Sequence, residues 1–213
     1  MKIGVLGSGN VGGTLGRRWA QGGHTVVFGT RRPESDEVQA LLAQAGPNAR
    51  AASSIDAVAA SDVVLVSTPW PATKEIVTAC GSLAGKIVVD ATNPLLPSLA
   101  GMEVGTTTSG AEMVAGWAPG ATVVKAFNTI GSNVMADAAF GAEKALMFYC
   151  GDDAAAKAVV GELAAELGFD ARDAGPLTQA RLLEPLALLW ISLAFAGGYG
   201  REFAFQILRR NAS

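Results

Sequence analysis

The chain has 213 residues and a formal net charge of −3, and 50% of its residues are apolar. That length suits one domain, or one domain with a small appendage, and it allows a sizeable core. Charged residues make up only 16% of the chain, and no basic run occurs. Nucleic acid and anionic membranes are therefore poor candidate partners, and we expect the partners to be small molecules.

Cysteine and histidine are scarce. Cys80 and Cys150 lie far apart, and His24 is the only histidine. This set predicts two buried thiols in a reducing compartment and no metal site. The first residues lead straight into a strand rather than a signal peptide, and the apolar stretch 185–199 is shorter than the roughly 20 residues of a bilayer span. We expect a cytoplasmic protein.

Short apolar strands alternate with helices through the first half of the chain. The pattern predicts strands over 2–6, 25–29, 49–52, 62–68 and 86–90, and helices over 11–21, 55–60 and 73–80. Such alternation is typical of a parallel sheet covered on both faces, and the strands are the nearly unbroken apolar runs that such sheets need.

The second half is less regular. It predicts strands over 122–127 and 145–150, a helix over 153–167, and a helix over 182–195 that is apolar, and therefore buried, on all sides. The fold class that we expect is α/β, a Rossmann-like doubly wound parallel sheet with a small C-terminal α+β lobe. Residues 1–124 would form the nucleotide-binding domain, and 125–213 the lobe.

A glycine motif ends the first strand and opens the first helix. It has the G-x-G-x-x-G spacing and consists of Gly7, Ser8, Gly9, Asn10, Val11 and Gly12. Gly7 permits the tight turn, Gly9 lets a pyrophosphate approach the backbone, and Gly12 lets helix and strand pack closely. The helix N-terminus then offers free N–H groups to the phosphates. The motif predicts a dinucleotide site.

The end of the second strand indicates which dinucleotide is bound. NAD-binding folds place an acid there, whereas this strand is followed by Thr30, Arg31 and Arg32. Two guanidinium groups and a hydroxyl suit a 2′-phosphate. The alternative is that both arginines are solvated surface charges. We expect NADP.

Two further strand ends border the expected cleft, because ligands of such sheets sit at the carboxyl ends of strands. Thr68 ends the strand at 62–68 and is followed by Pro69 and Trp70, and Asn93 follows the strand at 86–90. Trp70 either forms a wall of the cofactor site or packs in the turn.

No convincing general acid or base is present. Lys125 lies inside an apolar strand, where a structural role is favoured over that of a base, and His24 precedes the second strand. Direct hydride transfer between nicotinamide and a flavin or deazaflavin ring needs mainly orientation of the two rings. We therefore assign no catalytic residue.

The chain resembles the NADPH-dependent coenzyme F420 reductase family over nearly its whole length. The resemblance rests on the motifs GSGNVGG, GTRRP, TPW, KAFNTI, CGDD, DAGPL and ARLLEPLALL. KAFN also occurs in the reductase domain of six-transmembrane metalloreductases and in related bacterial NADP-binding reductases. The resemblance implies phosphate contacts at Ser8 to Val11, and a 2′-phosphate at Thr30 to Arg32. It also implies contacts to ribose and nicotinamide from Thr68 to Trp70 and from Ala126 to Thr129, which include Asn128, and a homodimer formed partly by the C-terminal helices.

Asn128 stands where reductases known to use the deazaflavin tend to carry a histidine, so the resemblance leaves the acceptor open among coenzyme F420, a flavin and a metal chelate. Our leading hypothesis is an NADP-dependent oxidoreductase that passes hydride between NADP(H) and coenzyme F420 or a flavin. One alternative is a dehydrogenase of a small alcohol or imine, although only about sixty residues follow Gly151 to build its helical domain. Another is a non-catalytic NADP(H) sensor.

Overall fold

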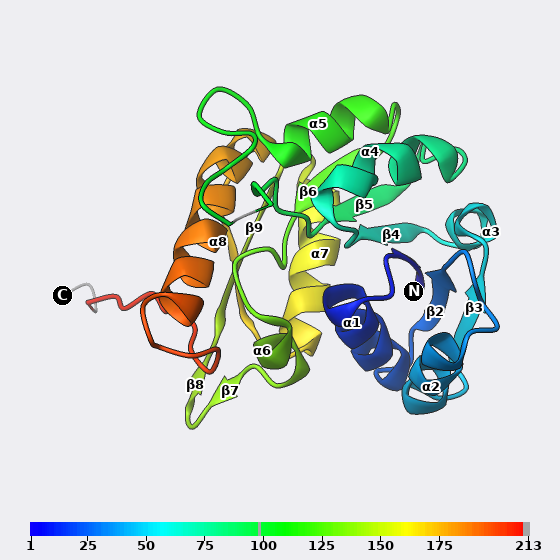
Figure 1. Cartoon of the computed structure of the whole chain (residues 1–213), viewed down its shortest axis with the longest axis horizontal. Helices are drawn as coiled ribbons and strands as arrows, with labels where there is room; N and C mark the ends of the chain where they lie inside the picture. Colours follow the sequence, from blue (N-terminus) through cyan, green and yellow to red (C-terminus); the bar gives the residue numbers. More distant parts are fainter. Residues whose placement is uncertain (98, 211–213) are drawn as a thin grey trace.

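The computed structural model describes residues 1–97 and 99–210 of the chain. Its centre is an eight-stranded sheet with the order β10-β9-β6-β5-β4-β1-β2-β3 (Figure 1). The strands are β1 (Lys2–Leu6), β2 (Thr25–Gly29), β3 (Ala49–Ala52), β4 (Val63–Val66), β5 (Ile87–Asp90), β6 (Thr122–Lys125), β9 (Leu146–Gly151) and β10 (Asp170–Asp173). Among the described residues, every neighbouring pair of strands in this sheet is parallel except β6–β9, which is antiparallel. The run from β3 to β6 has the doubly wound order of dinucleotide-binding folds, which confirms the expected fold class.

Helices cover both faces of this sheet (Figure 1). One face carries α1 (Asn10–Gln21), α2 (Asp36–Ala45), α6 (Ser132–Ala136) and α7 (Ala154–Glu166). The other face carries α3 (Ser54–Ala59), α4 (Trp70–Ala79), α5 (Gly110–Trp117) and α8 (Ala180–Phe195), with the short 3₁₀ turn Leu177–Gln179 before α8. The hairpin of β7 (Ala139–Phe140) and β8 (Glu143–Lys144) stands outside the main sheet.

Local sequence explains where several of these elements begin. The Ser53 and Ser109 hydroxyls and the Asp153 carboxylate cap α3, α5 and α7 by accepting a backbone N–H in the first turn. The strand β4 is buried along its whole length because helices cover both of its faces, which suits its four β-branched and aliphatic residues.

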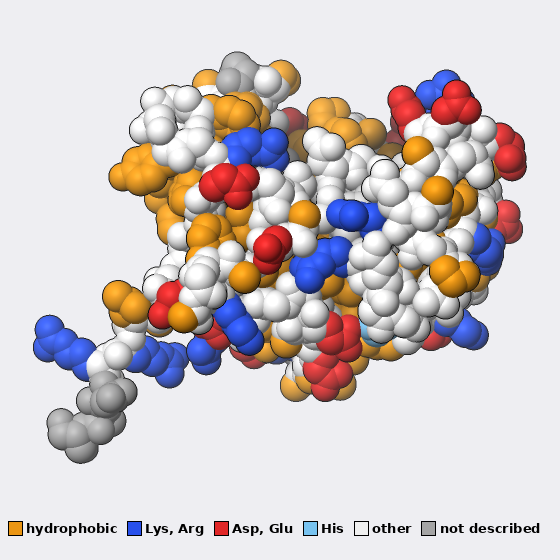
Figure 2. All heavy atoms as spheres, turned by 90° about the horizontal axis from the view of Figure 1, so that it is seen from below, with side chains coloured by type: hydrophobic (Ala, Val, Ile, Leu, Met, Phe, Trp, Pro, Cys, Tyr) orange, Lys and Arg blue, Asp and Glu red, His pale blue; other side chains and the backbone are white. Residues whose placement is uncertain are grey.

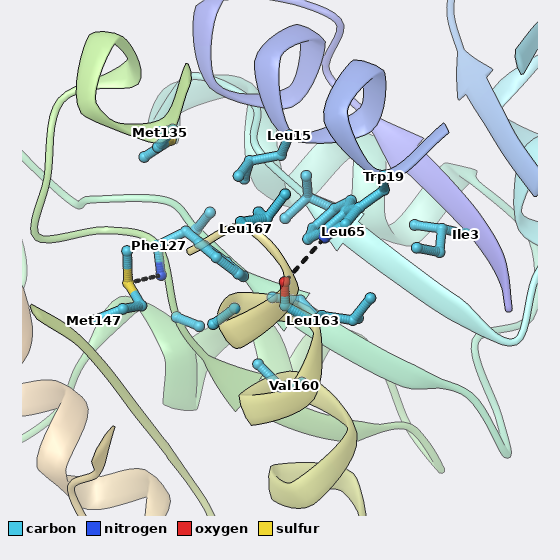
Figure 3. Close-up of a cluster of buried hydrophobic side chains, with 14 of the residues drawn as sticks. Ile3, Leu15, Trp19, Leu65, Phe127, Met135, Met147, Val160, Leu163 and Leu167 are labelled. Atoms are coloured by element: carbon cyan, nitrogen blue, oxygen red, sulfur yellow. Dashed lines mark hydrogen bonds between the residues drawn. The ribbon is translucent and has the colours of Figure 1, made fainter. Parts of the chain in front are cut away.

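The core between the sheet and α1 is built around large side chains (Figure 3). The Trp19 indole packs edge-to-face on Phe127, with ring centroids 5.7 Å apart, and its Nε1 donates to the Leu163 carbonyl of α7 at 3.2 Å. The neighbouring Arg18 donates to the carbonyls of Met135 and Leu167 at 3.0 and 2.7 Å. Helix α1 is thus attached to both α6 and α7.

Helix α8 differs from the expectation of burial on all sides. Its inner stripe, which includes Leu183, Ala187 and Trp190, is buried, whereas Leu182 and Leu189 are 66% and 50% exposed. The prediction was wrong because hydrophobicity alone does not say how many faces of a helix find a partner within one chain. Hydrophobic side chains also reach the surface on this side of the molecule, at the left of Figure 2.

The C-terminal third continues the main sheet rather than starting a new one. β9 pairs with β6, and β10 pairs with β9, so the sheet extends past the expected boundary between 124 and 125, which falls within β6. The division into two domains stays a prediction. After α8 the chain returns along the same side, where Phe203 stacks on Trp190 with ring centroids 5.1 Å apart. None of the helices in the described ranges is long and apolar enough to cross a bilayer.

Candidate NADP site

The glycine loop connects β1 to α1, and each glycine has a distinct physical role. Gly7 has a φ of +102°, and a Cβ built there would lie 2.8 Å from the Ser67 carbonyl oxygen. A Cβ on Gly12 would collide with the Gly7 carbonyl oxygen and the Ser67 hydroxyl. In contrast, a Cβ on Gly9 would meet no atom within 4 Å, so the space above Gly9 is open. The loop therefore leaves room for a ligand where the motif requires it.

The open start of α1 suits an anion. Gly9 is the N-cap residue and provides no side-chain hydrogen bond, and the first turn of the helix contains no acidic residue. Its first N–H groups therefore keep the partial positive charge that binds phosphate at helix N-termini. Ser8 is half-buried beside them, while Asn10 is exposed and Val11 half-buried in the first turn. This part of the site fits a pyrophosphate.

A cavity of about 350 Å³ opens at the carboxyl edge of β1, β2 and β4. It brings together six of the predicted residues, namely Gly7, Ser8, Thr30, Arg31, Thr68 and Pro69. Five further lining residues were not predicted, namely Gly29, Ser54, Ala72, Glu75 and Ile76. Gly29 ends β2, and Ser54 begins α3. Ala72, Glu75 and Ile76 lie in the first two turns of α4. Position at the carboxyl edge was the only available signal for them.

The two arginines after β2 lie at the surface. Arg31 lines the cavity, and the backbone N–H of Arg32 donates to the Thr30 hydroxyl at 3.2 Å, which closes a turn. Within residues 1–97 and 99–210, neither guanidinium forms an ion pair, not even with the nearby Glu34 or Asp36. Both side chains are therefore available to a phosphate.

Trp70 lies in the core rather than in this cavity. Its side chain is only 8% exposed and packs against Trp117, with ring centroids 5.4 Å apart. It also contacts Gly110 at the start of α5. The structure thus shows that Trp70 packs in the core and braces α4 against α5, and its contact with the cofactor stays a prediction.

A second group of predicted residues lies further along the carboxyl edge, after β5 and β6. The Asn93 amide donates to the backbone carbonyl of Asn128 at 2.9 Å, and the Asn128 amide donates to Asn93 Oδ1 at 3.1 Å and to the Leu183 carbonyl at 3.0 Å. Because two of these acceptors are backbone carbonyls, the orientation of both amides is fixed. Asn128 Oδ1 is buried and has no hydrogen-bond partner among the described residues.

The residues between β6 and Asn128 are strained. Phe127 is buried and has a φ of 61°, in the left-handed region that non-glycine residues rarely occupy. Its N–H donates to the sulfur of Met147 at 3.2 Å (Figure 3). Ala126 is fully buried beside it. A buried orphan acceptor next to a strained residue is typical of a ligand-binding edge.

Lys125 is held in a buried cluster that the sequence alone did not reveal. Its ammonium group donates to Asp90 Oδ2 at 2.9 Å, to the Thr92 carbonyl at 2.6 Å and to Glu184 Oε1 at 2.8 Å. Burial by itself lowers the pKa of Lys125, but attraction by Asp90 and Glu184 outweighs burial and raises the pKa overall. With all three protons donated and no exposed surface, Lys125 is not placed to exchange protons with a substrate.

The other reactive side chains lie apart from the cavity. His24 precedes β2 at the opposite, amino edge of the sheet, where it contacts the N-terminal amine and Glu166. Cys80 and Cys150 are both buried and unpaired, and burial raises the pKa of the Cys150 thiol to about 12. The described residues contain no group of three side chains that could hold a metal ion.

The sheet order and the glycine loop place the chain in the class of dinucleotide-binding proteins. The model of the coenzyme F420-dependent NADP oxidoreductases matches residues 2–94. The F420-dependent NADP reductase of Methanocaldococcus jannaschii is 31% identical over 207 residues, which cover 91% of this chain and 92% of that protein. The chain belongs to the family of F420-dependent NADP oxidoreductases.

Solved structures and a mammalian relative agree with this family. A candidate F420-dependent NADP reductase from Arthrobacter sp. FB24 is 37% identical and superposes with a TM-score of 0.88, over 98% of this chain and 100% of that one. The metalloreductase STEAP3 of Rattus norvegicus is 33% identical over 88% of this chain, but the chain spans only 37% of that protein's length. The protein is thus an NADP-dependent oxidoreductase by family.

Proposed function

We propose that this protein transfers hydride between NADP(H) and coenzyme F420 or a flavin. The observation that carries the proposal is the cavity at the carboxyl edge, which joins the open glycine loop to Arg31, whose guanidinium has no ion pair among the described residues. Open space above Gly9, free N–H groups on α1 and an available guanidinium fit the pyrophosphate and 2′-phosphate of NADP. Family membership supports the acceptor class.

The residues of the chain would bind and orient the two cofactors. The glycine loop would hold the pyrophosphate, Thr30 with Arg31 and Arg32 would hold the 2′-phosphate, and Asn93 and Asn128 lie at the edge expected for the nicotinamide. The reduced nicotinamide supplies the hydride. The chain's own contribution to rate is proximity and orientation, because Lys125 and His24 are both committed to internal contacts.

The test is a steady-state assay of NADPH oxidation with coenzyme F420, FMN, FAD and a ferric chelate offered in parallel. We expect turnover with the deazaflavin or with a flavin, and a value of kcat/KM far larger for NADPH than for NADH. Turnover only with ferric chelates would move the protein towards the metalloreductases. Tight NADPH binding with no turnover of any acceptor would contradict the proposal in favour of a sensor.

A further inference from the structure

The buried cluster of Asp90, Lys125 and Glu184 carries a net negative charge. Asp90 accepts hydrogen bonds from the N–H and hydroxyl of Thr92 as well as from Lys125. Glu184 accepts from Lys125 and from the backbone N–H groups of Gly110 and Ala111. Among the described residues, every hydrogen bond to the two carboxylates comes from a donor, which is the environment of ionised groups.

The formal charges of the cluster sum to −1, from two carboxylates and one ammonium group. The two N–H groups at the start of α5 offset part of that charge. All three side chains are 0–1% exposed, so water screens the cluster far less than it would a surface pair. Its field therefore extends into the neighbouring carboxyl edge of the sheet.

The cluster lies at the carboxyl edge of the sheet, next to the expected nicotinamide position. Asp90 and Lys125 are the last residues of β5 and β6. A dinucleotide lies across the switch point between β1 and β4, and the cavity with Arg31 is on the β2 side of that point. The nicotinamide half then falls on the β5 side, where the orphan oxygen of Asn128 and the strained Phe127 are found.

We propose that Asp90, Lys125 and Glu184 form a buried counter-charge that favours the oxidised, cationic nicotinamide over the reduced, neutral one. The inference rests on the proposed binding of NADP(H) at this edge. A net negative charge nearby lowers the energy of the cationic ring and leaves that of the neutral ring almost unchanged. The same field favours NADPH as the hydride donor, because positive charge develops on its ring as hydride leaves.

The test compares dissociation constants of NADP⁺ and NADPH in the wild-type protein and in Glu184→Gln and Asp90→Asn. Each variant removes one negative charge. We expect the ratio Kd(NADP⁺)/Kd(NADPH) to rise about ten- to twentyfold, as a unit charge roughly 10 Å away implies at an effective dielectric constant of about 20. Adenosine 2′,5′-bisphosphate, which lacks the nicotinamide, should bind all three proteins alike.

Glu112→Gln is the matched control. Glu112 lies in the first turn of the same helix α5, but it is partly exposed and paired with Arg181, so the same change of charge there should leave the ratio unchanged. Because both constants come from one preparation, a fraction of unfolded protein cancels in the ratio. If one buried variant fails to fold, the other carries the test.

The ratio in the wild-type protein also contains every other contact to the two nucleotides, so the change of the ratio between wild type and variant is what reports the counter-charge. An unchanged ratio in the folded variants would overturn the inference, with the proposed function intact. Failure of the wild-type protein to bind either nucleotide would instead remove the proposed function.

Discussion

Arg31 and Arg32 should determine the choice of nucleotide. Each charge-assisted hydrogen bond to the 2′-phosphate contributes about 1.5–3 kcal/mol, so replacing both arginines by alanine should weaken NADPH binding roughly a hundredfold or more. NADH lacks that phosphate and should be almost unaffected. Titration with both nucleotides measures this, and Arg50→Ala, an exposed arginine on the neighbouring β3, is the control. Equal losses for the two nucleotides would exclude a 2′-phosphate site.

Lys125 should matter for stability and not as a proton carrier. Removing one partner of a buried ion pair typically costs about 3–5 kcal/mol, so Lys125→Met should lower the free energy of unfolding by that order. Lys157→Met, which breaks a partly exposed pair with Asp173, should cost under about 1 kcal/mol. Denaturant unfolding measures both. The folded fraction of Lys125→Met should keep the shape of the wild-type pH–rate profile, and loss of an ionisation from it would make Lys125 a general base.

The pH dependence of stability follows from the same residue. The pKa of Lys125 is raised in the folded state above its ordinary value of 10.5. A raised pKa contributes stability that is complete below the unfolded pKa and is lost as pH rises through the folded one. The wild-type protein should therefore lose stability above about pH 10.5 more steeply than Lys125→Met does, as denaturant unfolding at several alkaline pH values would show.

The role of a residue could be predicted where the residues that act together are close in sequence. The spacing of Gly7, Gly9 and Gly12 predicted the loop, and Arg31 comes two residues after the end of the second strand. The partnership of Lys125 with Glu184 spans 59 residues, and nothing in either neighbourhood indicates it. The role of Trp70 could not be predicted, because a bulky side chain at the carboxyl edge of a strand can contact a ligand or pack in the core. Its packing depends on the position of Trp117, which is distant in sequence.

At the scale of elements, substitutions in the glycine loop should affect nucleotide binding and folding separately. Gly9→Val points a side chain into open space, so the fold should survive while the pyrophosphate is blocked. Gly12→Ala collides with the backbone of the same loop and should lower the free energy of unfolding by about 1–3 kcal/mol or more. Melting curves with and without NADPH measure both effects. Gly9→Val should lose the stabilisation by ligand and keep the wild-type melting temperature of the free protein. Persistent binding would move the site elsewhere.

Most strands were predicted because a parallel strand buried on both faces needs an apolar run, as in β4. The predicted strands at 62–68 and 122–127 extend two residues past the ends of β4 and β6, because Ser67 and Thr68 are uncharged and Ala126 and Phe127 are apolar, although both pairs belong to the site loops. Helices α2 and α5 were missed, since their alanine- and glycine-rich sequences carry weak periodicity. The exposed strand β10 was missed because charged residues occupy it.

At the scale of the whole molecule, the outer face of α8 gives the expected homodimer a physical basis. Leu182, Leu189 and Phe195 are each at least half exposed on one helix or at its end. We propose that a second copy of the chain covers this face, because apolar side chains clustered on a surface mark interaction sites. Leu182→Asp combined with Leu189→Asp should convert the dimer into monomers in light scattering coupled to size-exclusion chromatography.

Ile55→Asp is the control for that experiment. Ile55 is 56% exposed on α3, away from α8, so a charge there should leave the dimer intact. A wild-type protein that is monomeric at all concentrations would contradict the homodimer. The exposed face of α8 would then be open to a different partner.

The attachment of α1 to α6 and α7 through Arg18 and Trp19 bears on how fast the nucleotide binds. A phosphate-binding helix fixed at its far end needs no ordering when the ligand arrives, so the entropic cost of association is small. Stopped-flow fluorescence should show a single phase whose observed rate constant rises linearly with NADPH concentration, with an association rate constant of about 10⁶–10⁷ M⁻¹s⁻¹. Arg18→Ala releases part of that attachment, and a second, concentration-independent phase should then report a loop that has to rearrange before it can bind.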